Sequence, residues 1–69
     1  MQVWDYGGGN AALYSEDSLV WEAARKAGLK QTAEYCRKDG VIFARQFVGE
    51  KEKVRELVKE LENGKEDQK

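Results

Sequence analysis

Apolar and polar side chains alternate in two runs between Gln31 and Val48, which is the pattern of two half-buried β-strands. Asp39-Gly40 separates the two runs. This dipeptide suits a two-residue type I′ turn, in which both central residues have positive φ and the twist of the turn matches that of the strands. The sequence therefore predicts a β-hairpin with its turn at Asp39-Gly40.

A two-residue turn also predicts the pairing across this hairpin. It places Tyr35 opposite Ala44, Glu34 opposite Arg45 and Cys36 opposite Phe43. Alternation then gives the hairpin two faces. One face carries Ala33, Tyr35, Arg37, Ile42, Ala44, Gln46 and Val48, and the other carries Thr32, Glu34, Cys36, Val41, Phe43, Arg45 and Phe47. Neither face is plainly the polar one.

Helical spacing of apolar residues predicts two helices. The first spans residues 16–27, with Ser15 as its N-cap, Gly28 as the left-handed residue that follows it, and Leu29 packed back on its last turn. The second spans residues 50–62, and its apolar positions are Val54, Leu57, Val58 and Leu61. Asn63-Gly64 is expected to stop the second helix, and residues 65–69 are expected to form a disordered tail.

Two shorter runs, residues 2–6 and 11–14, are separated by Gly7-Gly8-Gly9-Asn10. Either both runs are strands, or residues 1–10 are a mobile arm and residues 11–14 form the first strand. The order of elements is then (β)βαββα. This order predicts a single α+β domain over residues 1–64, with two helices and a small, mostly antiparallel sheet of three or four strands. Strand order and the face that the helices cover are left open.

The chain has 69 residues, so its hydrophobic core is small. Domains of this size often add disulfides, a metal or a partner subunit. The chain has a single cysteine, Cys36, which cannot form an internal disulfide, and no histidine to complete a usual zinc site, which leaves close packing or oligomerisation. No signal peptide or membrane span is visible in the sequence, so we expect a cytoplasmic protein that binds neither membrane nor metal.

Positive charge is concentrated in one part of the chain, although the net charge is only −1. Residues 25–45 carry six basic and two acidic side chains, and aromatic residues lie among them. Such a surface suits nucleic acids, because rings stack on bases and cations neutralise phosphates. This gives an alternative function, a nucleic-acid-binding accessory protein that uses Lys30, Arg37, Lys38 and Arg45. The acidic pI of about 5.4 argues against it.

No group of residues in the sequence defines a reaction. The glycine run lacks the Lys-Ser/Thr ending of a phosphate-binding loop, Cys36 has no histidine to serve as its base, and Asp5 has no evident partner. We therefore expect a non-enzymatic protein without a cofactor, and no motif is specific enough to name a family.

The preferred hypothesis is association with a protein, most simply with a second copy of the chain. If both helices cover the Tyr35 face of the hairpin, the other face is left as an exposed apolar patch. The predicted interface consists of Cys36, Val41, Phe43 and Phe47, extended by Trp21 and by Trp4. Two copies would then pack sheet to sheet as a homodimer. Helices on opposite faces, or an N-terminal arm folded over the patch, would instead give a plain monomer.

Overall fold

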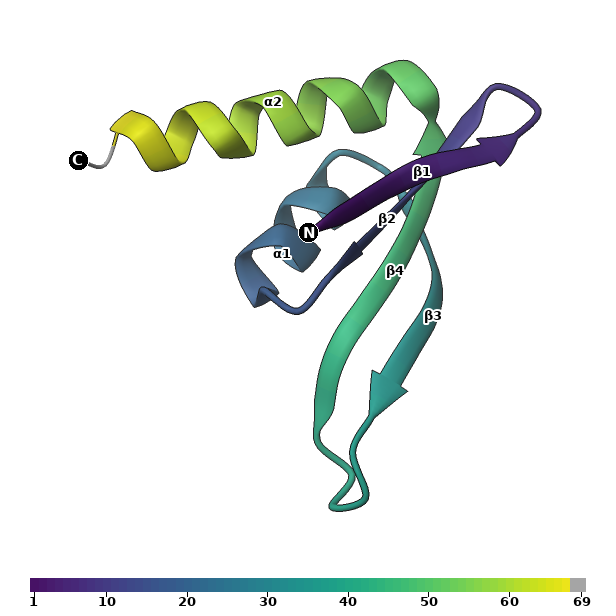
Figure 1. The fold of residues 1–69 in the computed structure, drawn as a ribbon, viewed down its shortest axis with the longest axis vertical. Coiled ribbons are helices and arrows are strands. Elements are labelled where there is room, and N and C mark those ends of the chain that lie inside the picture. Colours follow the sequence, from purple (N-terminus) through teal and green to yellow (C-terminus); the bar gives the residue numbers. More distant parts are fainter. Residues whose placement is uncertain (68–69) are drawn as a thin grey trace.

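The computed structural model describes residues 1–67, with the side chains of residues 1–62. It has two layers, a four-stranded antiparallel sheet and a pair of helices (Figure 1). The elements are β1 (Gln2–Gly7), β2 (Asn10–Ser15), α1 (Ser18–Lys26), β3 (Lys30–Cys36), β4 (Ile42–Glu50) and α2 (Lys51–Asp67). The predicted α+β class and the order ββαββα are confirmed.

The strands lie in the order β1-β2-β4-β3, so β2 and β4 form the centre of the sheet and β1 and β3 its edges. The pairing of β2 with β4 places Leu13 opposite Phe47 and Ala11 opposite Gly49. Residues 2–7 form a true strand paired with β2, rather than a mobile arm. The N-terminal segment is therefore part of the sheet.

A tight turn at Gly8-Gly9 joins β1 to β2, with Gly7 paired to Asn10. The φ angles of Gly8 and Gly9 are +61° and +80°, so both central residues have the positive φ that a type I′ turn requires. The carbonyl of Gly9 accepts a hydrogen bond of 3.0 Å from the backbone N–H of Lys51. This bond ties the turn to the first residue of α2.

The predicted two-residue turn at Asp39-Gly40 is wrong, because the loop contains three residues. The N–H of Arg37 donates to the carbonyl of Val41, and the N–H of Gly40 donates to the carbonyl of Arg37, both at 2.9 Å. Gly40 has φ of +86°, and among residues 1–67 positive φ is found at glycines alone. These features describe a turn over Arg37–Gly40 followed by a left-handed glycine, the usual three-residue hairpin loop.

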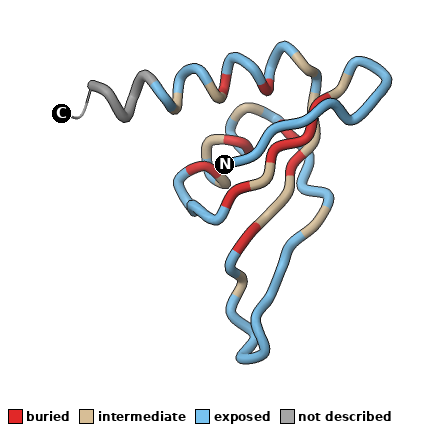
Figure 2. The backbone as a smooth tube through the Cα atoms, viewed as in Figure 1, coloured by how far each residue is buried: buried red, intermediate tan, exposed pale blue. Residues whose placement is uncertain are grey.

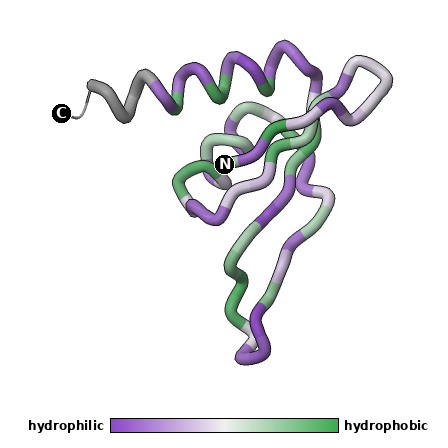
Figure 3. Tube along the Cα trace, viewed as in Figure 1, coloured by the Kyte–Doolittle hydropathy of each residue, from purple (hydrophilic) through white to green (hydrophobic). Residues whose placement is uncertain are grey.

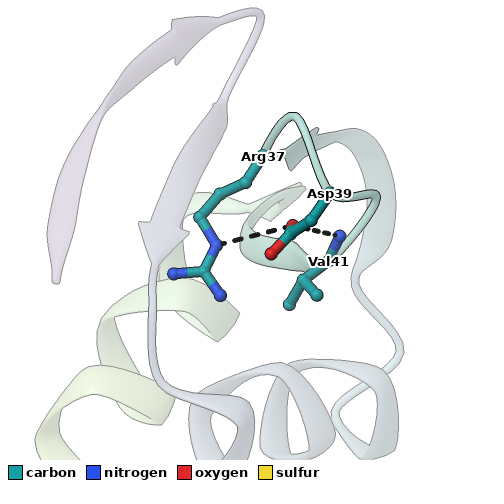
Figure 4. A network of polar contacts seen from close by, with 3 residues as sticks. All are labelled: Arg37, Asp39 and Val41. Carbon is teal, nitrogen blue, oxygen red and sulfur yellow. Dashed lines mark hydrogen bonds and ion pairs between the residues drawn. The ribbon is translucent and has the colours of Figure 1, made fainter.

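The side chain of Asp39 explains this choice of loop (Figure 4). Its Oδ1 accepts a hydrogen bond of 3.0 Å from the N–H of Val41, two residues further on. The same oxygen lies 3.8 Å from Nε of Arg37. Both charged groups are exposed, so we attribute the loop geometry mainly to the hydrogen bond and to Gly40.

The longer loop changes the pairing near the turn. Glu34 opposite Arg45 and Tyr35 opposite Ala44 are confirmed, but Cys36 lies opposite Ile42 instead of Phe43. Phe43 is thus an extra residue on β4, and its ring centroid lies 6.3 Å from that of Tyr35. The bulge brings Phe43 to the Tyr35 side of the hairpin.

Helix α1 begins later than predicted because Ser15 belongs to β2, where it is buried. Asp17 is the N-cap, and its carboxylate accepts a hydrogen bond of 2.9 Å from the N–H of Leu19. The predicted C-terminus is confirmed. Gly28 has φ of +85°, and Leu29 donates from its N–H to the carbonyl of Ala24, as in a Schellman motif.

Helix α2 continues through Asn63 and Gly64 to Asp67, so the stop predicted at these two residues is wrong. Residues 65–67 of the predicted tail are helical, and residues 68–69 lie outside the described part of the chain. Hydrophobic and hydrophilic positions alternate along α2 with helical spacing (Figure 3). One side of the helix therefore packs on the sheet.

Both helices pack on the same face of the sheet. The core between the layers contains Ala11, Leu13, Val20, Ala24, Leu29, Phe47, Val54 and Leu57. Phe47, Leu13 and Val54 are its largest fully buried side chains. Buried residues gather where β2, β4 and the helices meet, whereas β1 and the end of the hairpin are exposed (Figure 2).

This arrangement corrects the predicted interface. The helices cover the face of the hairpin that carries Phe47, and Phe47 has no exposed surface. Phe47 is a core residue and is unavailable to a partner. The interface hypothesis required the helices to cover the Tyr35 face, but this is the face without helices.

The two phenylalanines of β4 provide a direct test of this assignment. Phe47→Ala should destabilise the protein by about 3–5 kcal/mol, because it leaves a cavity in the core. Phe43→Ala should cost clearly less, about 1 kcal/mol, because 38% of Phe43 is exposed. Urea unfolding followed by circular dichroism would measure both changes. An equal or larger loss for Phe43→Ala would contradict the described packing.

Candidate functional site

The face of the sheet opposite the helices is the candidate site, and we call it the open face. Successive side chains point to opposite faces, so residues that alternate with Leu13 and Phe47 point away from the core. The pairings place these residues on the open face: Gln2, Trp4, Asn10, Ala12, Tyr14, Lys30, Ala33, Tyr35, Ala44, Gln46, Val48 and Glu50. Bulges add Thr32 and Phe43, which contact Gln46 and Tyr35.

Three aromatic rings lie together on the open face, one from each of β2, β3 and β4. Tyr14 and Tyr35 meet edge to face, with 5.6 Å between their centroids and an interplanar angle of 67°. Phe43 continues the row beyond Tyr35. Edge-to-face contacts of this kind stabilise aromatic pairs by about 0.5–1.5 kcal/mol beyond the area they bury. The rings are therefore held in defined positions before any partner binds.

Small residues lie between the large ones on this face. Ala12 and Ala44 have no exposed surface, although they point away from the helices. Larger neighbours within the sheet must cover these alanines. Trp4, which pairs with Ala12, is 39% exposed, and Tyr35, which pairs with Ala44, is 38% exposed. The result is a layer of side chains that is exposed only on its outer surface.

Uncharged hydrogen bonds link the polar groups of the open face. The hydroxyl of Tyr35 donates to Oε1 of Gln46 at 3.3 Å, and Nε2 of Gln46 donates to Oγ1 of Thr32 at 3.1 Å. Partial burial, followed by the nearby charge of Glu16, raises the pKa of Tyr14 above its usual value. The Tyr14 phenol is thus neutral at physiological pH. The centre of the open face carries no charge.

The six residues of the predicted interface are spread over the molecule. Phe43 and Trp4 lie on the open face, Phe43 beside its aromatic neighbours. Cys36 and Val41 are exposed near the hairpin loop, where Val41 is 48% exposed. Trp21 packs against the core on the helix side, and its Nε1 donates to the carbonyl of Ser15 at 2.7 Å.

The four basic residues of the alternative hypothesis do not form one surface. Arg45 is on the helix side, with its guanidinium carbon 4.9 Å from the ring centre of Trp21 and Nη1 bonded to Gln31. Arg37 and Lys38 lie at the hairpin loop, whereas Lys30 begins β3 at the other end. Of the four, only Lys30 occupies an open-face position.

The described residues contain no group of three or more His, Cys, Asp or Glu side chains that could hold a metal ion. The most enclosed hollow, of about 70 Å³ beside Ser15 and Val20, is well below the size of usual ligand sites. Two larger hollows, of about 240 Å³ beside Leu57 and about 410 Å³ beside Gly9 and Arg55, are shallow and open to solvent. Neither helix, over the part that the structure describes, combines the length and apolar composition needed to cross a bilayer.

The sequence pattern did not indicate Tyr14 and Gln46 as members of the site, and it indicated Trp4 only as an extension of the predicted interface. Trp4 and Tyr14 occupy alternate positions in two short runs, which is the signal of strand faces. That signal does not say which strand pairs with which. Only the pairing of β2 with β4 brings Tyr14 opposite Gln46 and beside Tyr35.

Comparison with known proteins gives no relative: no family model, no curated protein and no solved structure matches this chain. Function must therefore be inferred from the surface itself.

Asp5 provides a prediction about pH. The N–H of Gly7 donates to its carboxylate at 3.0 Å and Lys51 lies 3.8 Å away, and these two groups lower the pKa of Asp5. A carboxyl with a lowered pKa stabilises the fold above its unfolded pKa, about 4, and this contribution disappears as pH falls through the folded value. Asp5→Asn should therefore be less stable than wild type at pH 7 and equally stable near pH 2. Urea midpoints at the two pH values would show this, and equal midpoints at pH 7 would contradict it.

Proposed function

We propose that the protein is a non-enzymatic interaction module that self-associates, with two copies packing through their open faces. The observation that carries the proposal is a face of aromatic, small apolar and uncharged polar residues whose charges lie at its ends, Lys30 and Glu50 at one end and Glu16, beside Tyr14, at the other. Interface centres are depleted of charge and enriched in aromatic residues. The open face has both properties.

The shape of the molecule supports this proposal. Its principal extents are 37 × 34 × 18 Å, so the domain is flat, with one layer of helices and one exposed sheet face. Its accessible surface is 5047 Å². A monomeric protein of 7.9 kDa is expected to expose about 4400 Å². The excess of about 600 Å² is spread over the flat sheet, the projecting hairpin and the projecting helix (Figure 1).

A second copy suits this face better than a nucleic acid does. The rings that could stack on bases are present, but Arg45 points to the other side and Arg37 is paired with Asp39. Phosphate binding needs several cations beside the rings, and its affinity falls with salt. Uncharged rings and amides instead favour a protein surface of the same composition, and an isologous dimer supplies one by symmetry.

Tyr35→Asp should weaken self-association, because it places a charge in the centre of the apolar contact and removes the ring that touches Tyr14 and Phe43. We expect wild type at tens of micromolar to sediment at twice the monomer mass of 7.9 kDa or more, and at a larger mass than the variant, whose open-face contact should need at least about tenfold higher concentration.

The matched control is Leu19→Asp, the same kind of change at a residue that is 69% exposed on α1. It should leave association unchanged. Wild type that sediments as a monomer would refute the proposal. Titration with labelled single strands at low salt tests the alternative, and salt-sensitive binding that is lost in Arg37→Ala and Lys30→Ala would favour it.

A further inference from the structure

We infer that the outer edge of β1 is a second self-association site, at which β1 pairs antiparallel with β1 of another copy around Val3. The pairing would join two four-stranded sheets into one of eight strands. This inference concerns the backbone edge of the sheet and is independent of the open face. It rests on the exposure, the composition and the regularity of β1.

Strand β1 is an edge strand, and all six of its residues are exposed. Within residues 1–67, hydrogen-bonded pairing of β1 is found on the β2 side, which leaves backbone N–H and C=O groups on the other side for another strand. Pairing with β2 is regular from Gln2 to Asp5, and the single irregularity follows at Tyr6. Four consecutive residues thus present a straight edge.

Natural proteins usually protect such edges with charged side chains, especially lysine, with proline or with a bulge in the exposed strand. The stretch Gln2-Val3-Trp4-Asp5 contains no lysine or proline, and its one charge, Asp5, lies at its end, just before the irregularity at Tyr6. The opposite edge, β3, is different, because its pairing is interrupted between Gln31 and Ala33, close to the middle of the strand. Strand β3 also carries Lys30 and Glu34. The two edges of the sheet are therefore not equivalent, and β1 is the less protected one.

Symmetry limits how two β1 strands can pair. A continuous antiparallel pair is related by a two-fold axis perpendicular to the sheet, so residues opposite each other lie on the same face. Centring the axis on Val3 places Val3 opposite its own copy and Gln2 opposite Trp4. Centring it on Trp4 would place Asp5 opposite Val3 and would include the irregular Tyr6. The Val3-centred pairing uses the regular stretch from Gln2 to Asp5, and it places Asp5 opposite Met1, beside the N-terminal amine, instead of opposite Val3.

The side chains at this edge would gain cover on both faces of the sheet. Val3, on the helix side, is 43% exposed, and Trp4, on the open face, is 39% exposed. In the Val3-centred pair, the two valines contact each other and each Trp4 lies beside a glutamine. The two open faces would also become one continuous surface, so edge pairs could stack through them as a closed tetramer.

The experiment uses Val3→Lys and Val3→Glu, each in the Tyr35→Asp background to remove contact through the open face. Tyr35→Asp alone should sediment at about 16 kDa, twice the monomer mass of 7.9 kDa, because the edge pair remains. Either charged variant alone should be monomeric, since like charges would lie directly opposite each other. An equimolar mixture of the two should return to about 16 kDa, because lysine then faces glutamate.

The matched control is Leu19→Lys in the same background, which adds an equal charge to an exposed residue of α1 and should not change the mass. Circular dichroism would show that every variant is folded. A monomeric Tyr35→Asp protein, charged variants that stay dimeric, or a mixture that stays monomeric would each overturn the inference. Tighter association of Val3→Lys alone would also overturn it, because this result would indicate the Trp4-centred pairing, in which Asp5 lies opposite residue 3. Wild type that sediments at the same mass as Tyr35→Asp, twice the monomer mass of 7.9 kDa, would instead show an edge pair without an open-face contact, and would count against the proposed function only.

Discussion

The contact between Leu13 and Phe47 is the one on which the rest of the structure depends. These side chains lie opposite each other on the two central strands, and both are fully buried. Once they point toward the helices, alternation assigns every other strand residue to a face. Burial of Phe47 on one side therefore requires Tyr14, Tyr35 and Gln46 to lie on the other.

Local patterns in the sequence predicted the elements well. The hairpin, both helices and the Schellman ending at Gly28 follow from neighbouring residues. The choice of face could not follow from them, because the two sides of the hairpin are about equally apolar. It was decided by Ala11 and Leu13, which are distant in sequence from Phe47 but pack with it in the core. The rest of the candidate site around Phe43 and Trp4 was missed for the same reason, since Tyr14 reaches it only through long-range pairing.

The wrong details also have local physical causes. Asp-Gly fits a type I′ turn and also a three-residue loop with a left-handed glycine, and the hydrogen bond from Val41 to the Asp39 carboxylate favours the second. Ser15 resembled a helix cap, but its place in β2 left that role to Asp17. One extra residue in the loop was sufficient to move Phe43 beside Tyr35 and so to change the composition of the surface.

The glycine turn between β1 and β2 has a consequence for energy coupling. Gly9 accepts a backbone hydrogen bond from Lys51, and the side chain of Lys51 lies beside Asp5, so the first hairpin and the start of α2 are held together. Anything that binds the folded form of this hairpin also favours the docked form of α2, by thermodynamic linkage. Binding at the outer edge of β1 would then stabilise the docked form of α2, although α2 is the helix farthest from β1 in the sequence. Self-association and the stability of the single subunit would therefore change together.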